Sequence, residues 1–252
     1  MVLLLTLCGW IAGGAYGAHR AMAAGLPWPD EPAMSPDIML WCFGARRLRS
    51  SDVPELFHIL AAVCRRAGLS RLPDLYYVAA PAKMNAYACG RPESSAIIIT
   101  AGLLRGMSIN EIAGILAHEV AHICNQDART MDWASALGRA IEWVSRTGVA
   151  WLQTSGRAPM DATLANLLSA APAISRLLFL ALSRTRELDA DATALDLTGD
   201  TRALVAALVK LERHHAGFTN PAGAAFDDGP MRFLRSHPAT AERVGTILRL
   251  VH

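Results

Sequence analysis

The stretch SINEIAGILAHEVAHICNQD, residues 108–127, decides how the rest of this chain is interpreted. It opens with the hydroxyl residue Ser108 and has the carboxylate residue Glu111 three positions later, which is the capping-box pattern of a helix N-terminus. We therefore expect a helix that begins near Ser108 and continues past His122.

This helix would carry the segment His118-Glu119-Val120-Ala121-His122. Residues i and i+4 share one face of a helix, so His118 and His122 can direct two imidazole nitrogens at one metal ion about 2.0–2.1 Å away. Glu119 is rotated by about 100° from His118, which places it beside the metal as a general base. The segment predicts a zinc site and, with Glu119, zinc-dependent hydrolysis of peptide bonds.

A catalytic zinc site needs a third protein ligand and an open position. In the segment SRTRELDADA, residues 183–192, Glu187 and Asp191 are again four residues apart. An acidic pair on a helix is by itself typical of a solvated face, but a metal helix earlier in the chain favours a ligand. We assign Glu187 as the third zinc ligand and Asp191 as the carboxylate that orients a zinc-binding histidine.

Composition favours contact with a membrane and excludes nucleic acid as a partner. Of the 252 residues, 52% are hydrophobic and only 18% are charged, and the mean hydropathy is +0.26. The net charge of +2 lacks the basic excess of a nucleic-acid-binding protein. Five cysteines without a C-x-x-C pair indicate neither a disulfide framework nor a cysteine zinc site.

Residues 2–18 carry no charge and are about long enough to span a bilayer. No basic residue precedes them, whereas Arg20, Arg46, Arg47 and Arg49 follow. This distribution predicts an anchor in the inner or plasma membrane with the catalytic domain facing the cytoplasm. Two alternatives are a cleaved leader, which would make the protein secreted or periplasmic, and a buried or interfacial segment, favoured by the glycines of this stretch.

Local patterns predict a mainly α protein with a small antiparallel β-sheet, of the α+β class. The Pro-rich stretch from Pro27 to Pro36 would be a linker, which divides the chain into residues 1–36 and a metallopeptidase domain over 37–252. Residues 132–182 form an Ala/Leu-rich helical insert, a candidate for membrane association in which Thr163 to Leu182 is the most apolar stretch. Further helices are expected over residues 53–67, 183–197, 202–215 and 239–251, and strands over 75–78, 84–89 and 96–100.

Four ordered stretches resemble the HtpX-type membrane metalloproteases and, more distantly, the zinc proteases that process prenylated CAAX proteins, all of the glutamate-zincin kind. The resemblance covers about residues 37–250 and implies a zincin-like fold and one zinc ion per chain. The matching stretches are MNAYA (84–88), HEVAHICNQD (118–127), RELDAD (186–191) and SHP (236–238).

The resemblance also implies roles for individual residues. Asn85 and Ala86 would lie on the edge strand that pairs with an extended polypeptide substrate. His237 would donate a hydrogen bond to the developing oxyanion, and Arg186 and Asp127 would brace the metal ligands. Asn85 as a turn residue and His237 as a helix cap are the simpler alternatives.

The chain differs from the resembling proteases in its membrane segments. They have two spans before the protease domain and a hydrophobic hairpin within it, whereas the N-terminal region here has room for about one span and residues 132–182 are interrupted by charges. The resemblance implies degradation of misfolded proteins at a membrane. The competing hypotheses are a non-catalytic membrane-associated scaffold with a structural zinc and a secreted or periplasmic zinc peptidase. The sequence does not give the oligomeric state.

Overall fold

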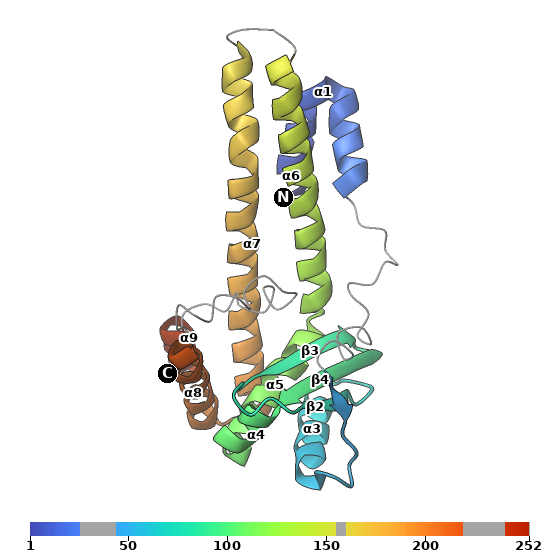
Figure 1. The fold of residues 1–252 in the computed structure, drawn as a ribbon. Helices are drawn as coiled ribbons and strands as arrows, with labels where there is room; N and C mark the ends of the chain where they lie inside the picture. Colours follow the sequence, from blue (N-terminus) through green and yellow to red (C-terminus); the bar gives the residue numbers. More distant parts are fainter. Residues whose placement is uncertain (26–43, 155–159, 219–239, 252) are drawn as a thin grey trace. The chain divides into compact units, whose positions relative to one another are not determined.

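The computed structural model describes residues 1–25, 44–154, 160–218 and 240–251 (Figure 1). The chain forms two compact units. The first comprises Met1–Ala33 and Arg129–Ser183, and the second comprises Met34–Ala128 and Arg184–His252.

The first unit is helical. It contains α1 (Val2–Gly25), most of α6 (Asp127–Thr154) and the N-terminal part of α7 (Met160–Thr198). Leu5 of α1, Ile141 of α6 and Leu168 of α7 are fully buried together in one apolar cluster. The Ser145 hydroxyl donates a hydrogen bond to the Leu168 carbonyl over 2.7 Å, so α6 and α7 lie side by side within this unit (Figure 1).

The second unit contains a four-stranded sheet in the order β1-β2-β4-β3. The strands are β1 (Arg46–Arg47), β2 (Asp74–Val78), β3 (Ala86–Arg91) and β4 (Ser94–Thr100). β1 with β2 and β3 with β4 are antiparallel, but β2 and β4 are parallel. The sheet is therefore mixed, whereas the sequence predicted a wholly antiparallel sheet. The reason is that β4 lies between β2 and β3, so the chain must cross over on its way from β2 to β3.

The hairpin between β3 and β4 turns two residues later than the sequence suggested. Gly90 and Arg91, expected in the turn, are the last residues of β3 and pair with Ser95 and Ser94. Gly90 has φ = +92°, and a Cβ atom at this position would lie 2.2 Å from the Ser94 carbonyl oxygen. Only glycine fits at this position, because the backbones of β3 and β4 approach each other too closely for a Cβ atom.

The helices of the second unit surround α5 (Ile109–Cys124), which is the metal helix of the sequence analysis. Its neighbours are α3 (Pro54–Arg66), strand β3 and α8 (Thr201–Phe218). The unit also contains α4 (Ala101–Gly106), α9 (Thr240–Val251) and the part of α7 that follows Ser183. At Gly114 a Cβ atom would lie 3.3 Å from the Leu204 Cα, so the missing side chain lets α8 approach closely.

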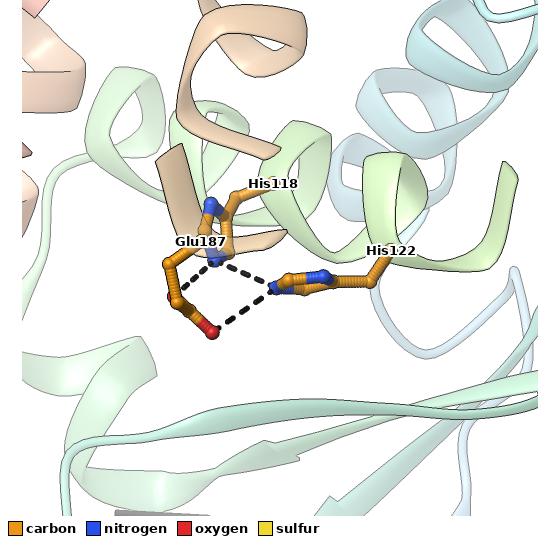
Figure 2. A group of neighbouring side chains, drawn as sticks. All are labelled: His118, His122 and Glu187. Atoms are coloured by element: carbon orange, nitrogen blue, oxygen red, sulfur yellow. Dashed lines mark hydrogen bonds and ion pairs between the residues drawn. The ribbon is translucent and has the colours of Figure 1, made fainter. Parts of the chain in front are cut away.

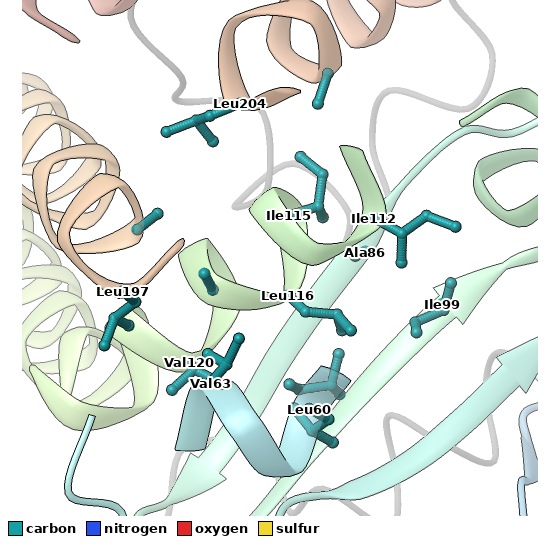
Figure 3. Packing of buried hydrophobic residues seen from close by; sticks show 14 of the residues in the cluster. Leu60, Val63, Ala86, Ile99, Ile112, Ile115, Leu116, Val120, Leu197 and Leu204 are labelled. Carbon is teal, nitrogen blue, oxygen red and sulfur yellow. The ribbon is translucent and has the colours of Figure 1, made fainter. Parts of the chain in front are cut away.

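One continuous apolar core joins these elements (Figure 3). It buries α5 on several sides, since His118 and Glu119 are buried as well as the apolar residues. The core includes Leu60 and Val63 of α3, Ala86 of β3, Ile99 of β4, Leu116 and Val120 of α5 and Leu204 of α8.

The helices follow the sequence pattern with one correction. Separate helices were expected before and after Ser183, but α7 runs without interruption from Met160 to Thr198. No glycine or proline separates the two predicted segments, and Pro172 lies within the helix without ending it. Gly68 and Gly199, which follow α3 and α7, have the positive φ angles expected of glycines after helix C-termini.

Among the described residues, one helical stretch, Thr163–Thr198, is long and apolar enough to cross a membrane. Only 17% of its most apolar window is buried, so it differs from the core helix of a soluble protein. It includes the stretch Thr163 to Leu182. At the N-terminus, Val2–Ile11 is apolar but shorter, and the anchor over residues 2–18 remains a prediction.

Candidate metal centre

The N-terminus of α5 fixes the start of the metal helix. The Ser108 hydroxyl accepts a hydrogen bond from the Glu111 backbone N–H, and the Glu111 carboxylate accepts one from the Ser108 backbone N–H over 2.7 Å. This is the predicted capping box. The Lys210 ammonium of α8 lies 2.7 Å from the same Glu111 carboxylate and ties α8 to the start of α5.

Three side chains converge at one point in the second unit (Figure 2). The Nε2 atoms of His118 and His122 are 3.0 Å apart. One Glu187 carboxylate oxygen lies 3.4 Å from His118 Nε2, and the other lies 3.6 Å from His122 Nε2. Glu187 comes from α7, so the predicted third residue meets the two histidines from a separate helix.

These distances fit a zinc ion. Ligand atoms placed 2.0–2.1 Å from a tetrahedral centre are about 3.3–3.5 Å from one another. The two histidine nitrogens are 3.0 Å apart, and each lies near a different Glu187 oxygen, at 3.4 and 3.6 Å. Two imidazoles and a carboxylate are also the donor types that zinc accepts. A metal ion could therefore be bound without rearrangement of the backbone.

The other ring nitrogen of each histidine contacts a carboxylate. His118 Nδ1 is 3.0 Å from an oxygen of Asp191, and His122 Nδ1 is 2.7 Å from an oxygen of Asp127. An N–H at Nδ1 leaves Nε2 unprotonated and directed at the metal, which is the usual arrangement of zinc-binding histidines. Both carboxylates that the sequence analysis placed behind the ligands are thus found there.

Arg186 extends this network on the His122 side. Its guanidinium lies 3.3 Å from Asp127 and also pairs with Asp189. The bracing role predicted for Arg186 therefore has a direct contact to support it.

The sequence analysis missed Arg243 of α9. This arginine is 5% exposed and binds both carboxylate oxygens of Asp191 over 2.6 Å. It also lies 3.5 Å from the Glu187 carboxylate. The available signal was its position one helical turn before Ile247, because these are the two buried residues of an otherwise more exposed helix.

Burial and ion pairing shift the pKa values of this cluster. Burial disfavours the charged form of His118, but hydrogen bonds to Asp191 and Glu187 outweigh it and raise its pKa to about 9 without metal. Burial likewise acts to raise the pKa of Asp191, yet its hydrogen bonds with Arg243 and His118 hold it below its usual value. The metal-free site therefore favours a protonated His118 beside an ionised Asp191.

The remaining predicted residues are placed as follows. Glu119 is buried on α5 beside His118, and its side chain makes no hydrogen bond to any described residue. Asn85 directly precedes β3: its carbonyl accepts a hydrogen bond from the Thr100 backbone N–H, and its own N–H donates to the Thr100 hydroxyl. Ala86 is the first residue of β3. His237 lies outside the described residues.

A helix that carries two histidines four residues apart with a glutamate after the first, completed by a glutamate from another helix, defines a metallopeptidase site of the H-E-x-x-H class. Comparison with known proteins identifies the family. The model of peptidase family M48 matches residues 50–251, and the chain therefore belongs to this family.

Three relatives show how far the similarity extends. A protease HtpX homologue of Acaryochloris marina is 36% identical over 234 residues, which cover 86% of this chain and 78% of the relative. A protease HtpX homologue of Nostoc punctiforme is 31% identical, with coverages of 98% and 91%. Protease HtpX of Legionella pneumophila (strain Lens) is 30% identical, with coverages of 98% and 94%. The resemblance inferred from four short stretches thus extends over nearly the whole chain.

Proposed function

We propose that this chain is a zinc-dependent endopeptidase that cleaves polypeptides at a membrane. The observation that carries the proposal is the convergence of His118, His122 and Glu187, with the outer nitrogen of each histidine against a carboxylate. Membership of peptidase family M48 supplies the reaction class, and the donor set supports zinc as the metal.

The number of ligands favours catalysis over a structural zinc. Structural zinc sites are closed by four protein ligands, whereas catalytic sites use three and keep one position open. Among the described residues the group that could hold a metal has three members. This supports an enzyme over the alternative of a non-catalytic scaffold.

In the proposed reaction Glu119 moves the protons. Its carboxylate accepts a proton from the attacking water and passes it to the nitrogen of the leaving amine. His118, His122 and Glu187 hold the zinc, which when bound supplies a Lewis acid that acidifies water and polarises the scissile carbonyl. The arrangement of Asp191 and Asp127 keeps both histidines in the tautomer that binds metal.

The edge of β3 that pairs with no strand among the described residues is the proposed binding surface for the substrate backbone. β3 is the last strand of the sheet and packs against α5. The Asn85 carbonyl accepts a hydrogen bond from the Thr100 N–H of the β4 side, so in an antiparallel ladder the backbone groups of Ala86 and Ala88 point to the opposite, outer edge. Ala86 would then pair directly with an extended peptide, while Asn85 fixes the start of the strand.

His237 remains the proposed donor to the oxyanion of the reaction. A His237→Ala variant should lower kcat with little effect on zinc content. Loss of zinc together with activity would contradict this role and assign His237 to the folding of the site.

Membrane association is supported by the apolar helical stretch Thr163–Thr198. We propose that the catalytic unit faces the cytoplasm, because Arg46, Arg47 and Arg49 are exposed on it and basic residues accumulate on the cytoplasmic side. Degradation of misfolded membrane or cytoplasmic proteins is the proposed role. Fusions of green fluorescent protein and of alkaline phosphatase to the C-terminus test the orientation, and activity of the phosphatase fusion alone would reverse it.

Glu119→Gln is the decisive variant for the chemistry. It keeps the size of the side chain but removes the base, so we expect stoichiometric zinc and a loss of casein hydrolysis of at least about 100-fold. Asp189→Asn, a charge change on the exposed side of α7, serves as the control. Hydrolysis by Glu119→Gln at the wild-type rate would show that Glu119 is not the base.

Glu187→Ala tests the third ligand through metal content. We expect the purified variant to lose zinc on dialysis under conditions in which the wild type retains one zinc per chain. Unchanged zinc affinity would remove Glu187 from the ligand set, and absence of zinc from the wild type would contradict the proposed cofactor.

A further inference from the structure

Arg243 places a fixed positive charge inside the metal site. Its side chain is 6% exposed, and three ionisable side chains in contact with it are also largely enclosed, with exposures of 5% for His118, 11% for Glu187 and 0% for Asp191. The buried Glu119 carboxylate attracts it as well. A buried guanidinium is stable only where carboxylates compensate its charge. Its position is therefore determined by the acidic residues of the site.

The guanidinium contacts the same atoms that would hold the metal. Two of its nitrogens bind the two oxygens of Asp191 over 2.6 Å. The third, Nη1, lies 3.5 Å from the Glu187 oxygen that faces His118, and Nη2 lies 3.4 Å from His118 Nε2. Arg243 thus stands directly beside the position where zinc would be bound.

The charge of Arg243 should stabilise the metal-free site and destabilise the zinc-bound site. Without a metal, the buried carboxylates of Glu187 and Asp191 would repel each other, and Arg243 compensates them. With a metal, zinc brings a second positive charge next to the guanidinium, and like charges at such separations repel strongly in a buried site.

We propose that Arg243 is a resident cation that keeps the metal site assembled when zinc is absent, at the expense of zinc affinity. This inference rests on the zinc site of the proposed function. Arg243 would then be a positioning residue that holds the Glu187 and Asp191 carboxylates in place in the metal-free protein. The site could fold before zinc binds.

The test compares Arg243→Met with Arg249→Met in the full chain, purified in detergent with and without zinc. Arg249 is an exposed residue of the same helix whose guanidinium binds the Thr246 hydroxyl, so it controls for loss of an arginine from α9. We expect Arg243→Met to lower the unfolding temperature of the zinc-free protein by roughly 6–20 °C relative to the control. We also expect it to tighten zinc binding about tenfold, measured by competition with a chelator.

Each other result would overturn the proposal. An equal loss of stability with and without zinc, with unchanged zinc affinity, would make Arg243 an ordinary structural ion pair. Weaker zinc binding by Arg243→Met would show that Arg243 supports the ligands of the bound metal. An unfolding temperature of the zinc-free variant equal to that of the control would show that the carboxylates need no such cation.

A second variant covers the case in which Arg243→Met does not fold without zinc. Asp191→Asn combined with Arg243→Met removes one charge of each sign and should restore folding of the zinc-free protein. Failure of the double variant to fold would overturn the proposal. If the wild type itself bound no zinc, the proposed cofactor would be wrong, and the zinc-free unfolding temperatures would still decide whether Arg243 stabilises this cluster.

Discussion

His122 Nδ1 lies 2.7 Å from a carboxylate oxygen of Asp127, although the two residues belong to different helices. The connection between α5 and α6 makes this contact possible. Gln126, between them, has φ = +53° in the left-handed region, and after this turn the side chain of Asp127, the first residue of α6, contacts His122. A short turn with an unusual backbone angle thus supplies the partner of a metal ligand.

Loss of Asp127 should weaken zinc binding. Asp127→Ala leaves the Nδ1 of His122 without its carboxylate, and we expect a 10- to 100-fold higher zinc dissociation constant. Asp189→Ala is the matched control, because Asp189 also pairs with Arg186 but contacts neither histidine. Chelator competition measures both. Equal effects of the two substitutions on the zinc dissociation constant would show that Asp127 acts through Arg186 and not through its contact with His122.

Zinc binding should depend on pH through His118. Its pKa of about 9 without metal means that zinc must displace a proton at neutral pH, so zinc should bind about tenfold more tightly for each pH unit between about 7 and 9. Asp191→Asn removes the strongest hydrogen bond that favours the protonated ring. The variant should release fewer protons on zinc binding, which calorimetry in buffers of different ionisation enthalpy detects. Equal proton release by both proteins would contradict this account.

The same pKa predicts how the stability of the metal-free protein changes with pH. The pKa of His118 is raised on folding from 6.5 to about 9, so protonation stabilises the fold fully below about 6.5. This stabilisation is lost as the pH rises through 9. The unfolding temperature of the zinc-free protein should therefore fall over this range, and that of the zinc-loaded protein should fall less.

The capping box at Ser108 should contribute measurable stability. Ser108→Ala removes the acceptor for the Glu111 backbone N–H, and such substitutions cost about 1 kcal/mol. For a chain of this size we expect a decrease of about 2–4 °C in unfolding temperature. Ser51→Ala is a control on the same unit, since this exposed hydroxyl caps no helix. A change no larger than that of the control would show that Lys210 alone fixes Glu111.

The parts of the site that could be predicted from the sequence are those set by local geometry. His118 and His122 are brought together by helical spacing, and the start of their helix is set by a capping box within the same segment. Glu187 lies 65 residues later, and no local rule brings it to the histidines. It could be proposed because a zinc site requires a third ligand and the chain offers a suitable carboxylate.

The features that were missed depend on packing between distant segments. Arg243 reaches Asp191 from a position 52 residues further along the chain. Its spacing from Ile247 places it on the buried face of α9, but this spacing does not reveal the carboxylate with which it pairs. The parallel pairing of β2 with β4 likewise depends on where the crossover places β3, which strand patterns do not encode. The burial of most residues of α5 follows from the same tertiary contacts.

Helix α4 offers a test of the segment that leads into β3. A Cβ atom at Gly102 would lie 2.2 Å from the Lys83 carbonyl oxygen, which belongs to the backbone between β2 and β3 and cannot rotate away. A Cβ atom at Gly106, on the same helix, would meet only the flexible end of the Met84 side chain. Gly102→Ala should therefore destabilise the protein by about 1–3 kcal/mol, whereas Gly106→Ala should be nearly neutral.

The same pair of variants tests whether β3 binds the substrate. A clash at Gly102 must push the Lys83 backbone away, and this displacement is passed on to Asn85 and Ala86 at the start of the strand. Below its unfolding temperature, Gly102→Ala should raise KM for an extended peptide severalfold while zinc content stays at the wild-type value. Gly106→Ala should leave KM unchanged. A Gly102→Ala enzyme with normal KM would show that peptide binding does not depend on the position of this edge strand.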